Sequence, residues 1–214
     1  MNFQKGEITI SKEQYIKNPC KSLATAYWKQ IAYPKNIRIL HESDFKDLEI
    51  CSNTEKYFRL FHSLNDIDTS KSNEYFFKNV NFKSEKQLVA RILSECYKTV
   101  YSLDFIENLI NTKVFDKDLW ILLFKKSTLL PVALGIADFD SEICEGSLEW
   151  VQVLPNERGL GLGTLIVNEL LLRLKSKAAF ATVSGEVDNE TKPEMLYRKC
   201  GFTGDDIWYV THIK

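Results

Sequence analysis

The chain has 214 residues and 44% hydrophobic content, enough for one domain of ordinary size with an extension. Its formal net charge is -1, from 28 basic and 29 acidic residues, so no overall charge favours nucleic acid or an anionic membrane surface. The five cysteines include no Cys-x-x-Cys pair and the three histidines are not spaced as ligands on a helix, so we expect free, buried thiols and no metal.

The N-terminal part, residues 1–73, matches no motif. Its first eleven residues carry no long apolar segment, and no apolar run in the chain approaches the ~18 residues of a membrane span, so we expect a cytoplasmic protein with no membrane partner. Asn18–Ser22, followed by Tyr27–Trp28, is either an arm that covers a substrate or a segment packed on a sheet. The elements predicted here are two strands with a short helix between them: Asn36–Leu40, Asp44–Cys51 and Tyr57–Leu64.

The polar stretch Asn65–Glu74 marks the boundary of the second part. Ser84 and Gln87 have the spacing of a capping box, which predicts a helix from Glu85 to about Tyr97. The turn Lys125–Thr128 lies between two apolar runs and predicts a hairpin. In order, we predict strand Tyr75–Asn81, helices Glu85–Tyr97 and Leu103–Asn111, and strands Trp120–Phe124, Leu130–Phe139 and Ser147–Leu154.

The most informative stretch is Arg158-Gly159-Leu160-Gly161-Leu162-Gly163, which lies between the apolar run Leu148–Leu154 and the amphipathic run Thr164–Leu174. This order predicts a strand, a glycine loop and a helix. Such a junction exposes backbone N–H groups at the positive end of a helix, and glycines let an anion approach the main chain without meeting a Cβ. We therefore expect the loop to bind a phosphate.

The spacing of this loop separates three kinds of phosphate site. A Walker A loop has a lysine directly after its last glycine, where Thr164 stands here. A dinucleotide fingerprint, Gly-x-Gly-x-x-Gly, counted from Gly159 or Gly161 has Thr164 or Ile166 at its third glycine. The stretch fits a third pattern, Arg-x-x-Gly-x-Gly, preceded by Val153-Leu154-Pro155.

The helix after the loop has an apolar face that should pack on the sheet, formed by Leu162, Leu165, Ile166 and Leu170. Its polar residues should lie on the other faces: Asn168, Glu169, Arg173 and Lys175. The remaining elements are strand Ala179–Ser184, helix Lys192–Lys199, which Pro193 can begin, and strand Ile207–Ile213.

A second motif, Leu196-Tyr197-Arg198-Lys199-Cys200-Gly201-Phe202, is similar to the Leu-Tyr-x-Lys-x-Gly-Phe that closes the fold of the GNAT N-acetyltransferase superfamily. The glycine loop resembles the acyl-CoA pyrophosphate loop of the same superfamily. The resemblance implies an α/β (α+β) fold in which a mixed, mostly antiparallel central sheet carries helices on both faces. This sheet is splayed between the strand before the glycine loop and the next strand. The resemblance covers 74–214 as an acyltransferase domain and leaves 1–73 as an N-terminal extension of unknown role, packed on that domain.

The resemblance also implies acetyl-CoA as co-substrate. Backbone amides of the loop would hold the pyrophosphate, with Arg158 beginning the turn and adding charge. The pantetheine arm would pair with the strand before the loop as an added strand does. Asn189 resembles a cofactor-contacting asparagine, although Glu190 stands at the family's usual distance from Tyr197. The expected cofactor-binding residues are Val151, Val153, Arg158, Gly159, Leu160, Gly161, Leu162, Gly163, Thr164 and Asn189.

Acetyl transfer to an amine needs a group that accepts the amine proton and one that protonates the thiolate. Glu149 is the expected base, since strand alternation gives it the same nominal face as Val153 unless a bulge shifts the register. A solvated strand glutamate is the alternative, and Glu145 and Glu186 are other candidates for the base. Tyr197 matches the family tyrosine that protonates the thiolate.

The residues thus predict an acetyl-CoA-dependent N-acetyltransferase that acts by direct attack in a ternary complex. A non-catalytic acyl-CoA-binding module and a structural protein whose loop is only a turn are the alternatives. The family's acceptor pocket implies Leu88–Asn111 and Gly201–Lys214 as its walls. The acceptor stays open between small-molecule and peptide amines, and the chain is a monomer or a homodimer.

Overall fold

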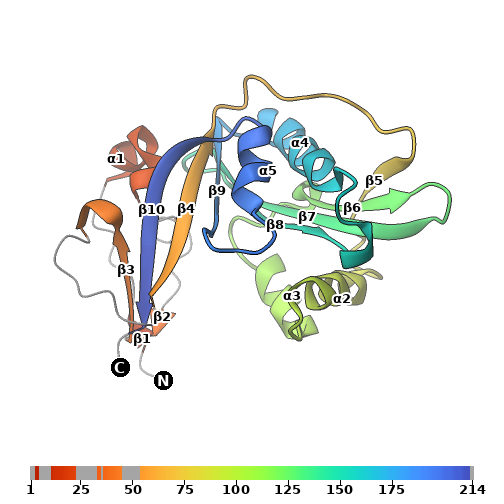
Figure 1. Cartoon of the computed structure of the whole chain (residues 1–214), viewed down its shortest axis with the longest axis horizontal. Helices are drawn as coiled ribbons and strands as arrows, with labels where there is room; N and C mark the ends of the chain where they lie inside the picture. The colour runs from red at the N-terminus through yellow and green to blue at the C-terminus, as the bar shows by residue number, and fades with distance from the viewer. Residues whose placement is uncertain (1–2, 5–10, 23–32, 35, 45–53, 213–214) are drawn as a thin grey trace. The chain divides into compact units, whose positions relative to one another are not determined.

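The computed structural model of the chain describes residues 3–4, 11–22, 33–34, 36–44 and 54–212 (Figure 1). The chain divides into two units: 1–62 with 182–198 and 202–214, and 63–181 with 199–201. Within the described ranges, no helix is both long enough and apolar enough to cross a membrane.

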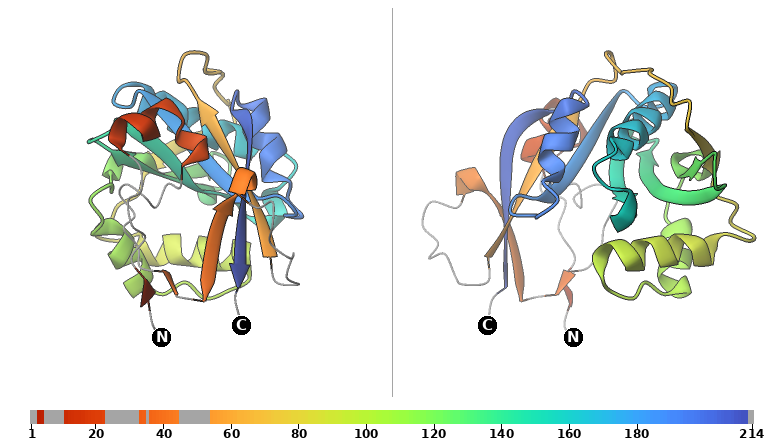
Figure 2. Two further views of the ribbon diagram at one scale, coloured as in Figure 1. Left: turned by 90° about the vertical axis from the view of Figure 1, so that its left-hand side faces the viewer. Right: turned by 45° about the vertical axis from the view of Figure 1, so that its right-hand side comes forward.

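The first unit is built around β10, which is paired on both sides. β10 pairs antiparallel with β3 through Tyr209 and Leu40, and with β4 through Tyr209 and Lys56. In the left view of Figure 2, orange β3 and amber β4 flank dark blue β10. The strand order is β3-β10-β4-β9, and β1 and β2 form a separate pair. Its elements are β1 (Phe3–Gln4), α1 (Lys12–Lys17), β2 (Tyr33–Pro34), β3 (Ile37–His41), β4 (Thr54–His62), β9 (Phe180–Glu186), α5 (Pro193–Lys199) and β10 (Thr203–His212).

The segment after α1 is held against these strands. The buried guanidinium of Arg59 in β4 donates to the Tyr15 hydroxyl at 2.9 Å and to the Pro19 carbonyl at 3.0 Å. The indole N–H of Trp208 in β10 donates to the Cys20 carbonyl at 2.9 Å. Asn18–Ser22 is therefore packed on the strands. Tyr27–Trp28 lies outside the described residues.

The second unit carries the glycine loop. Its strands β5 to β8 form consecutive antiparallel pairs, in the order β8-β7-β6-β5. Trp120 pairs with Ile136, and Ile136 in turn with Trp150, so these three side chains share one face. Its elements are β5 (Tyr75–Asn79), α2 (Lys86–Tyr97), α3 (Leu103–Ile110), β6 (Trp120–Lys125), β7 (Leu130–Asp140), β8 (Glu145–Val153) and α4 (Leu162–Lys175).

Helices cover both faces of this antiparallel sheet, with α2 and α3 on one side and α4 on the other (Figure 1). Val89 and Ile92 of α2 join Leu134 of β7 in one buried core cluster. On the opposite face α4 packs so closely that Cβ atoms built at Gly135 and Gly146 would lie within 2.6 Å of side chains of α4. The predicted class, a mixed α/β fold with a mostly antiparallel sheet, is thus confirmed.

Several local predictions are wrong in detail. Ser84 and Gln87 form no capping box: Glu85 is the N-cap of α2, and the N–H groups of Ser84 and Glu85 donate to the Asn81 carbonyl at 3.0 and 2.7 Å. This turn precedes α2 and begins the helix without a serine cap. Asn168 of α4 is buried, although the helical pattern assigned it to a polar face.

Two other expectations concern the thiols and the N-terminal helix. The described cysteines are free as expected, but Cys144 is exposed, because it occupies the turn between β7 and β8. The helix predicted at Asp44–Cys51 falls outside the described residues except for Asp44, which ends a 3-10 turn, Glu42–Asp44.

Candidate functional site

The glycine loop connects the end of β8 to the first turn of α4 within the second unit. A 3-10 turn, Pro155–Glu157, follows β8 and reverses the chain. Gly159 and Gly161 then adopt φ values of +82° and +76°, which L-residues with a side chain rarely adopt. Gly161 is the N-cap of α4, so the loop ends at the positive pole of a 14-residue helix.

The main chain of this loop is open to an approaching group. Cβ atoms built at Gly159 and Gly161 would meet nothing within 4 Å. The Gly161 carbonyl accepts from the N–H of Thr164 at 3.1 Å. The part of the chain that the structure describes supplies no acceptor for the N–H groups of Leu160, Leu162 and Gly163. Amides without an acceptor at a helix N-terminus form a site that suits phosphate, so the loop fits the pyrophosphate of acyl-CoA.

At the C-terminal end of β8, some backbone N–H and C=O groups point away from β7. The Leu154 N–H donates to the Val132 carbonyl at 3.0 Å, so Val153 and its partner Ala133 form a non-hydrogen-bonded pair. The N–H and C=O of Val153 therefore point to the side opposite β7, and so do those of Val151, two residues earlier. Both predicted valines therefore have the backbone orientation that pairing with a strand on that side requires.

Arg158 and Cys96 both reach the carbonyl of Val153. The Arg158 Nε–H donates to this oxygen at 3.2 Å, and the Cys96 thiol of α2 donates to it at 3.5 Å. Burial raises the pKa of the Cys96 thiol, and the nearby Arg158 guanidinium partly opposes this shift. The sequence motif identified Arg158, but nothing in the sequence pointed to Cys96, because α2 and β8 meet only in the folded unit.

Glu149 lies at a β-bulge. The register of β7 and β8 shifts between Ile136, which pairs with Trp150, and Ala137, which pairs with Leu148, so Glu149 stands where the register changes. Its carboxylate accepts from the Ser147 hydroxyl at 2.9 Å. Ser147 and Trp150 both lie on the face of α2 and α3, so the bulge moves Glu149 to that face. The nominal face shared with Val153 is wrong, for the reason that strand alternation fails at a bulge.

The alternative base candidates occupy different environments. Glu145 begins β8 and is buried, with 1% of its surface exposed. Glu186 ends β9 and is exposed. Of the three carboxylates, only that of Glu149 belongs to the bulge of β8. Glu149 precedes Val151 by two residues and is therefore close to the backbone groups that point away from β7.

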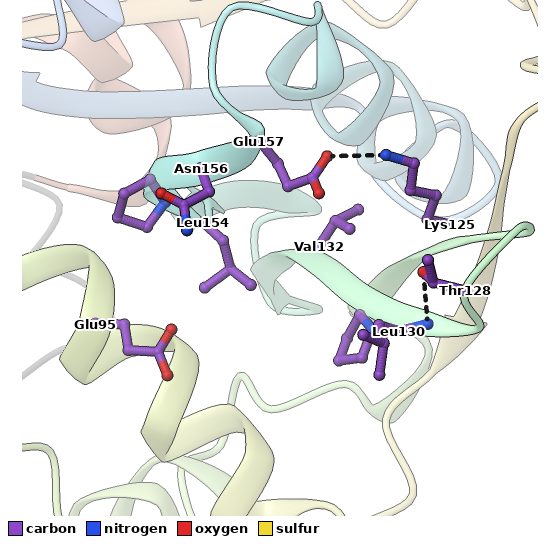
Figure 3. A pocket seen from close by; sticks show the side chains of 10 residues that line it. Glu95, Lys125, Thr128, Leu130, Val132, Leu154, Asn156 and Glu157 are labelled. Carbon is purple, nitrogen blue, oxygen red and sulfur yellow. Dashed lines mark hydrogen bonds and ion pairs between the residues drawn. The ribbon is translucent and has the colours of Figure 1, made fainter.

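A cavity of about 470 Å³ opens beside the turn between β8 and the loop (Figure 3). Leu154, Val132 and Leu130 give it an apolar floor, and the Glu95 carboxylate points toward it from α2. An ion pair between Lys125 and Glu157, 3.7 Å apart, closes its upper side in this view. The cavity thus has both apolar and charged residues in its lining, and all of them belong to the second unit.

Tyr197 and Asn189 lie in the first unit. Tyr197 is buried in α5, with its ring 6.2 Å from that of Phe58 and 5.7 Å from that of Phe202. The side-chain oxygen of Asn189 accepts from the N–H of Thr191 at 2.9 Å, which forms a local turn before α5.

One group of possible metal ligands occurs among the described residues. His41, Glu42 and Asp206 have ligand atoms within 4.8 Å of one another. The His41 Nε2 and the Asp206 carboxylate already form a pair at 3.0 Å, and Ser43 contacts the other ring nitrogen at 2.9 Å. These hydrogen bonds account for the cluster without an ion.

Solved structures of acetyltransferases resemble this fold. A GCN5-related N-acetyltransferase from Sphaerobacter thermophilus matches with a TM-score of 0.63 at 12% identity, over 74% of this chain and 51% of that protein. A putative acetyltransferase of the GNAT family from Novosphingobium aromaticivorans matches with 0.55 at 9%, over 85% and 68%. The glucosamine N-acetyltransferase region of a fungal multi-domain beta-N-acetylglucosaminidase matches with 0.58 at 16%, over 80% and 22%.

These matches extend over only part of some relatives. The chain spans about half the length of the Sphaerobacter protein and of a Drosophila protein of known structure, 51% of each. At sequence identities of 9–17%, the likeness concerns the fold. No protein-family model and no curated protein matches the sequence.

Proposed function

We propose that this chain, which has the fold of the GNAT superfamily, is an N-acyltransferase that moves an acetyl group from acetyl-CoA to a primary amine. The open glycine loop carries the proposal: positive-φ glycines, exposed amides and the N-terminus of α4 lie together at the end of β8. Acetyltransferase folds among the solved structures support the same activity class.

In this proposal the pyrophosphate lies on the amides of Gly159–Thr164, and the pantetheine arm pairs with the outward-facing backbone of Val151 and Val153. The arm takes the place of Arg158 at the Val153 carbonyl. Because Arg158 is exposed, its guanidinium can turn toward the phosphates at little cost, which would exchange a neutral acceptor for a charged one. The resemblance gives Asn189 a further contact to the cofactor.

The chemistry follows from two proton transfers. The neutral amine nitrogen attacks the thioester carbonyl carbon, a C–N bond forms, and the C–S bond breaks to release the CoA thiolate. Glu149 accepts the proton that the amine loses, directly or through water, and the Tyr197 hydroxyl gives a proton to the thiolate.

The remaining parts of the proposal are the division of the chain and its setting. Residues 74–214 are the proposed acyltransferase domain, and 1–73 are an N-terminal extension whose strands β3 and β4 pair with β10. The protein acts in the cytoplasm as a monomer or homodimer, without a metal. Its acceptor is a small-molecule or peptide amine.

The proposal is tested by incubating the protein with acetyl-CoA and each of a panel of amines, and by measuring how much free CoA is released. The wild type should release CoA stoichiometrically with acetylated amine, detected by mass spectrometry. The double variant Glu149→Gln/Tyr197→Phe should still bind CoA but should no longer catalyse acetyl transfer. Binding without turnover by the wild type over a broad panel would instead favour a non-catalytic acyl-CoA-binding module, and no binding would leave the loop as a turn only.

A further inference from the structure

Four aromatic rings form a continuous row from α2 to β8 within the second unit. The centroids of Tyr97 and Tyr101 lie 5.8 Å apart, those of Tyr101 and Phe105 5.0 Å, and those of Phe105 and Trp150 6.0 Å. The distances and tilts of these pairs are those of favourable aromatic contacts. We call Tyr97, Tyr101, Phe105 and Trp150 the aromatic row.

The far end of the aromatic row is open to solvent and surrounded by apolar side chains. Tyr97 is 46% exposed, and its neighbours Val100 and Leu103 are 92% and 43% exposed. The connection from α2 to α3 thus shows apolar surface that a monomer usually buries. Exposed apolar clusters of this kind mark binding surfaces.

Hydrogen bonds fix the open end of the row. The Tyr97 hydroxyl accepts from the Gln152 amide at 3.0 Å. The Tyr101 N–H donates to the Ser94 hydroxyl at 3.0 Å. The Tyr97 ring and the main chain at Tyr101 are therefore held before any ligand arrives, which lowers the entropy cost of binding.

The near end of the row is one residue along β8 from the glutamate proposed as base. Trp150 follows Glu149 directly, and both lie on the face of β8 that is turned to α2 and α3. A carboxylate beside aromatic faces suits an ammonium group, which is attracted by the negative charge and by the ring quadrupoles. The apolar side chains farther along suit the carbon skeleton behind that ammonium.

We infer that the acceptor is a primary amine carried on an aromatic or branched apolar group, with its ammonium at Glu149 and its apolar part on the aromatic row. The inference rests on the proposed function and narrows its substrate class. Polyamines and amino sugars would require charged or hydrogen-bonding partners along their length. The row instead offers ring faces, and its one amide partner, Gln152, already serves Tyr97.

The probe is phenethylamine. Its direct binding to the protein is measured by quenching of tryptophan fluorescence and by calorimetry, each with and without saturating CoA. The wild type should bind phenethylamine at least tenfold more tightly than spermidine or glucosamine. Tyr97→Ala should weaken binding about three- to tenfold, and Tyr97→Phe should restore it. Leu129→Ala, which removes a still more exposed apolar side chain from the β6–β7 turn, should leave phenethylamine binding unchanged.

The role of the charge is tested with phenethyl alcohol, which lacks the ammonium. Glu149→Gln should weaken binding of phenethylamine and leave that of the alcohol unchanged. Equal affinity for the three amines, unchanged binding in Tyr97→Ala, or no saturable phenethylamine binding in either condition would overturn the inference. Failure of the proposed function would show separately, as absence of CoA binding or release in samples that still bind phenethylamine.

Discussion

Replacing Gly161 by aspartate and by asparagine separates the charge of the loop from its shape. Both side chains tolerate the left-handed conformation that Gly161 adopts at φ +76°, and both find open space, since a Cβ there meets nothing within 4 Å. The two side chains are nearly equal in size, and aspartate adds a favourable interaction with the helix dipole. Gly161→Asp should therefore be at least as stable as Gly161→Asn.

Binding of CoA should change in the opposite direction. A carboxylate about 4 Å from a phosphate charge is repelled by ~1 kcal/mol in a water-like environment and by ~4 kcal/mol near a protein surface of low effective dielectric. The dissociation constant of Gly161→Asp should accordingly exceed that of Gly161→Asn by about 5-fold to 1000-fold. Because Gly161 is exposed, added salt should narrow the gap.

Calorimetric titration of both variants with CoA, at low and high salt, gives the ratio, and thermal unfolding gives the stability. Equal dissociation constants for the two variants, with both folded, would refute the reasoning that anion binding occurs at this helix N-terminus. Gly159→Ala serves as the control, because Gly159 has a similar φ of +82° but stands at a variable position of the Arg-x-x-Gly-x-Gly pattern. Of the three variants, Gly159→Ala should show the smallest loss of affinity for CoA.

Three further predictions address chemistry, thiols and packing. Glu149→Gln and Tyr197→Phe should each lower kcat about 100-fold or more with little change in acetyl-CoA affinity; wild-type kcat in both would exclude these roles. Burial raises the pKa of Cys200 to about 11, so its thiolate fraction at pH 8 is about 100-fold below that of an ordinary thiol. Alkylation followed by peptide mass spectrometry should modify exposed Cys144 first, and Cys200 should react faster as pH rises toward its pKa; equal rates at pH 8 would contradict this. Gly135→Ala should cost about 1–3 kcal/mol, because its Cβ would lie 2.4 Å from Ile166, and an unchanged denaturation midpoint would contradict this packing.

The order of elements in 75–212 could be predicted from the sequence because each element has a local signal. Hydrophobic periodicity identified α4, and the glycines after β8 identified the loop, since a positive φ is a property of single residues. The start of α2 could not be predicted in detail. Asn81 binds two N–H groups there, and the competing Ser84–Gln87 pattern was locally equally good.

The site residues that sequence reasoning missed depend on contacts between distant segments. Cys96 reaches the Val153 carbonyl across 57 residues, and the Tyr97 and Gln152 side chains meet across 55. Neither pair has a local pattern. The face of Glu149 was also beyond prediction, because a bulge depends on how two strands pair and not on the alternation within one.

The amides of the glycine loop give the most direct test of the proposed acetyl-CoA site. With glycine-selective isotope labelling, an NMR spectrum of the protein contains signals from only nine glycines. Addition of acetyl-CoA should shift the signals of Gly159, Gly161 and Gly163 in a saturable manner and leave that of Gly135, buried under α4, nearly unchanged. Unmoved loop signals at saturating acetyl-CoA would contradict the proposed site and the acetyltransferase function built on it.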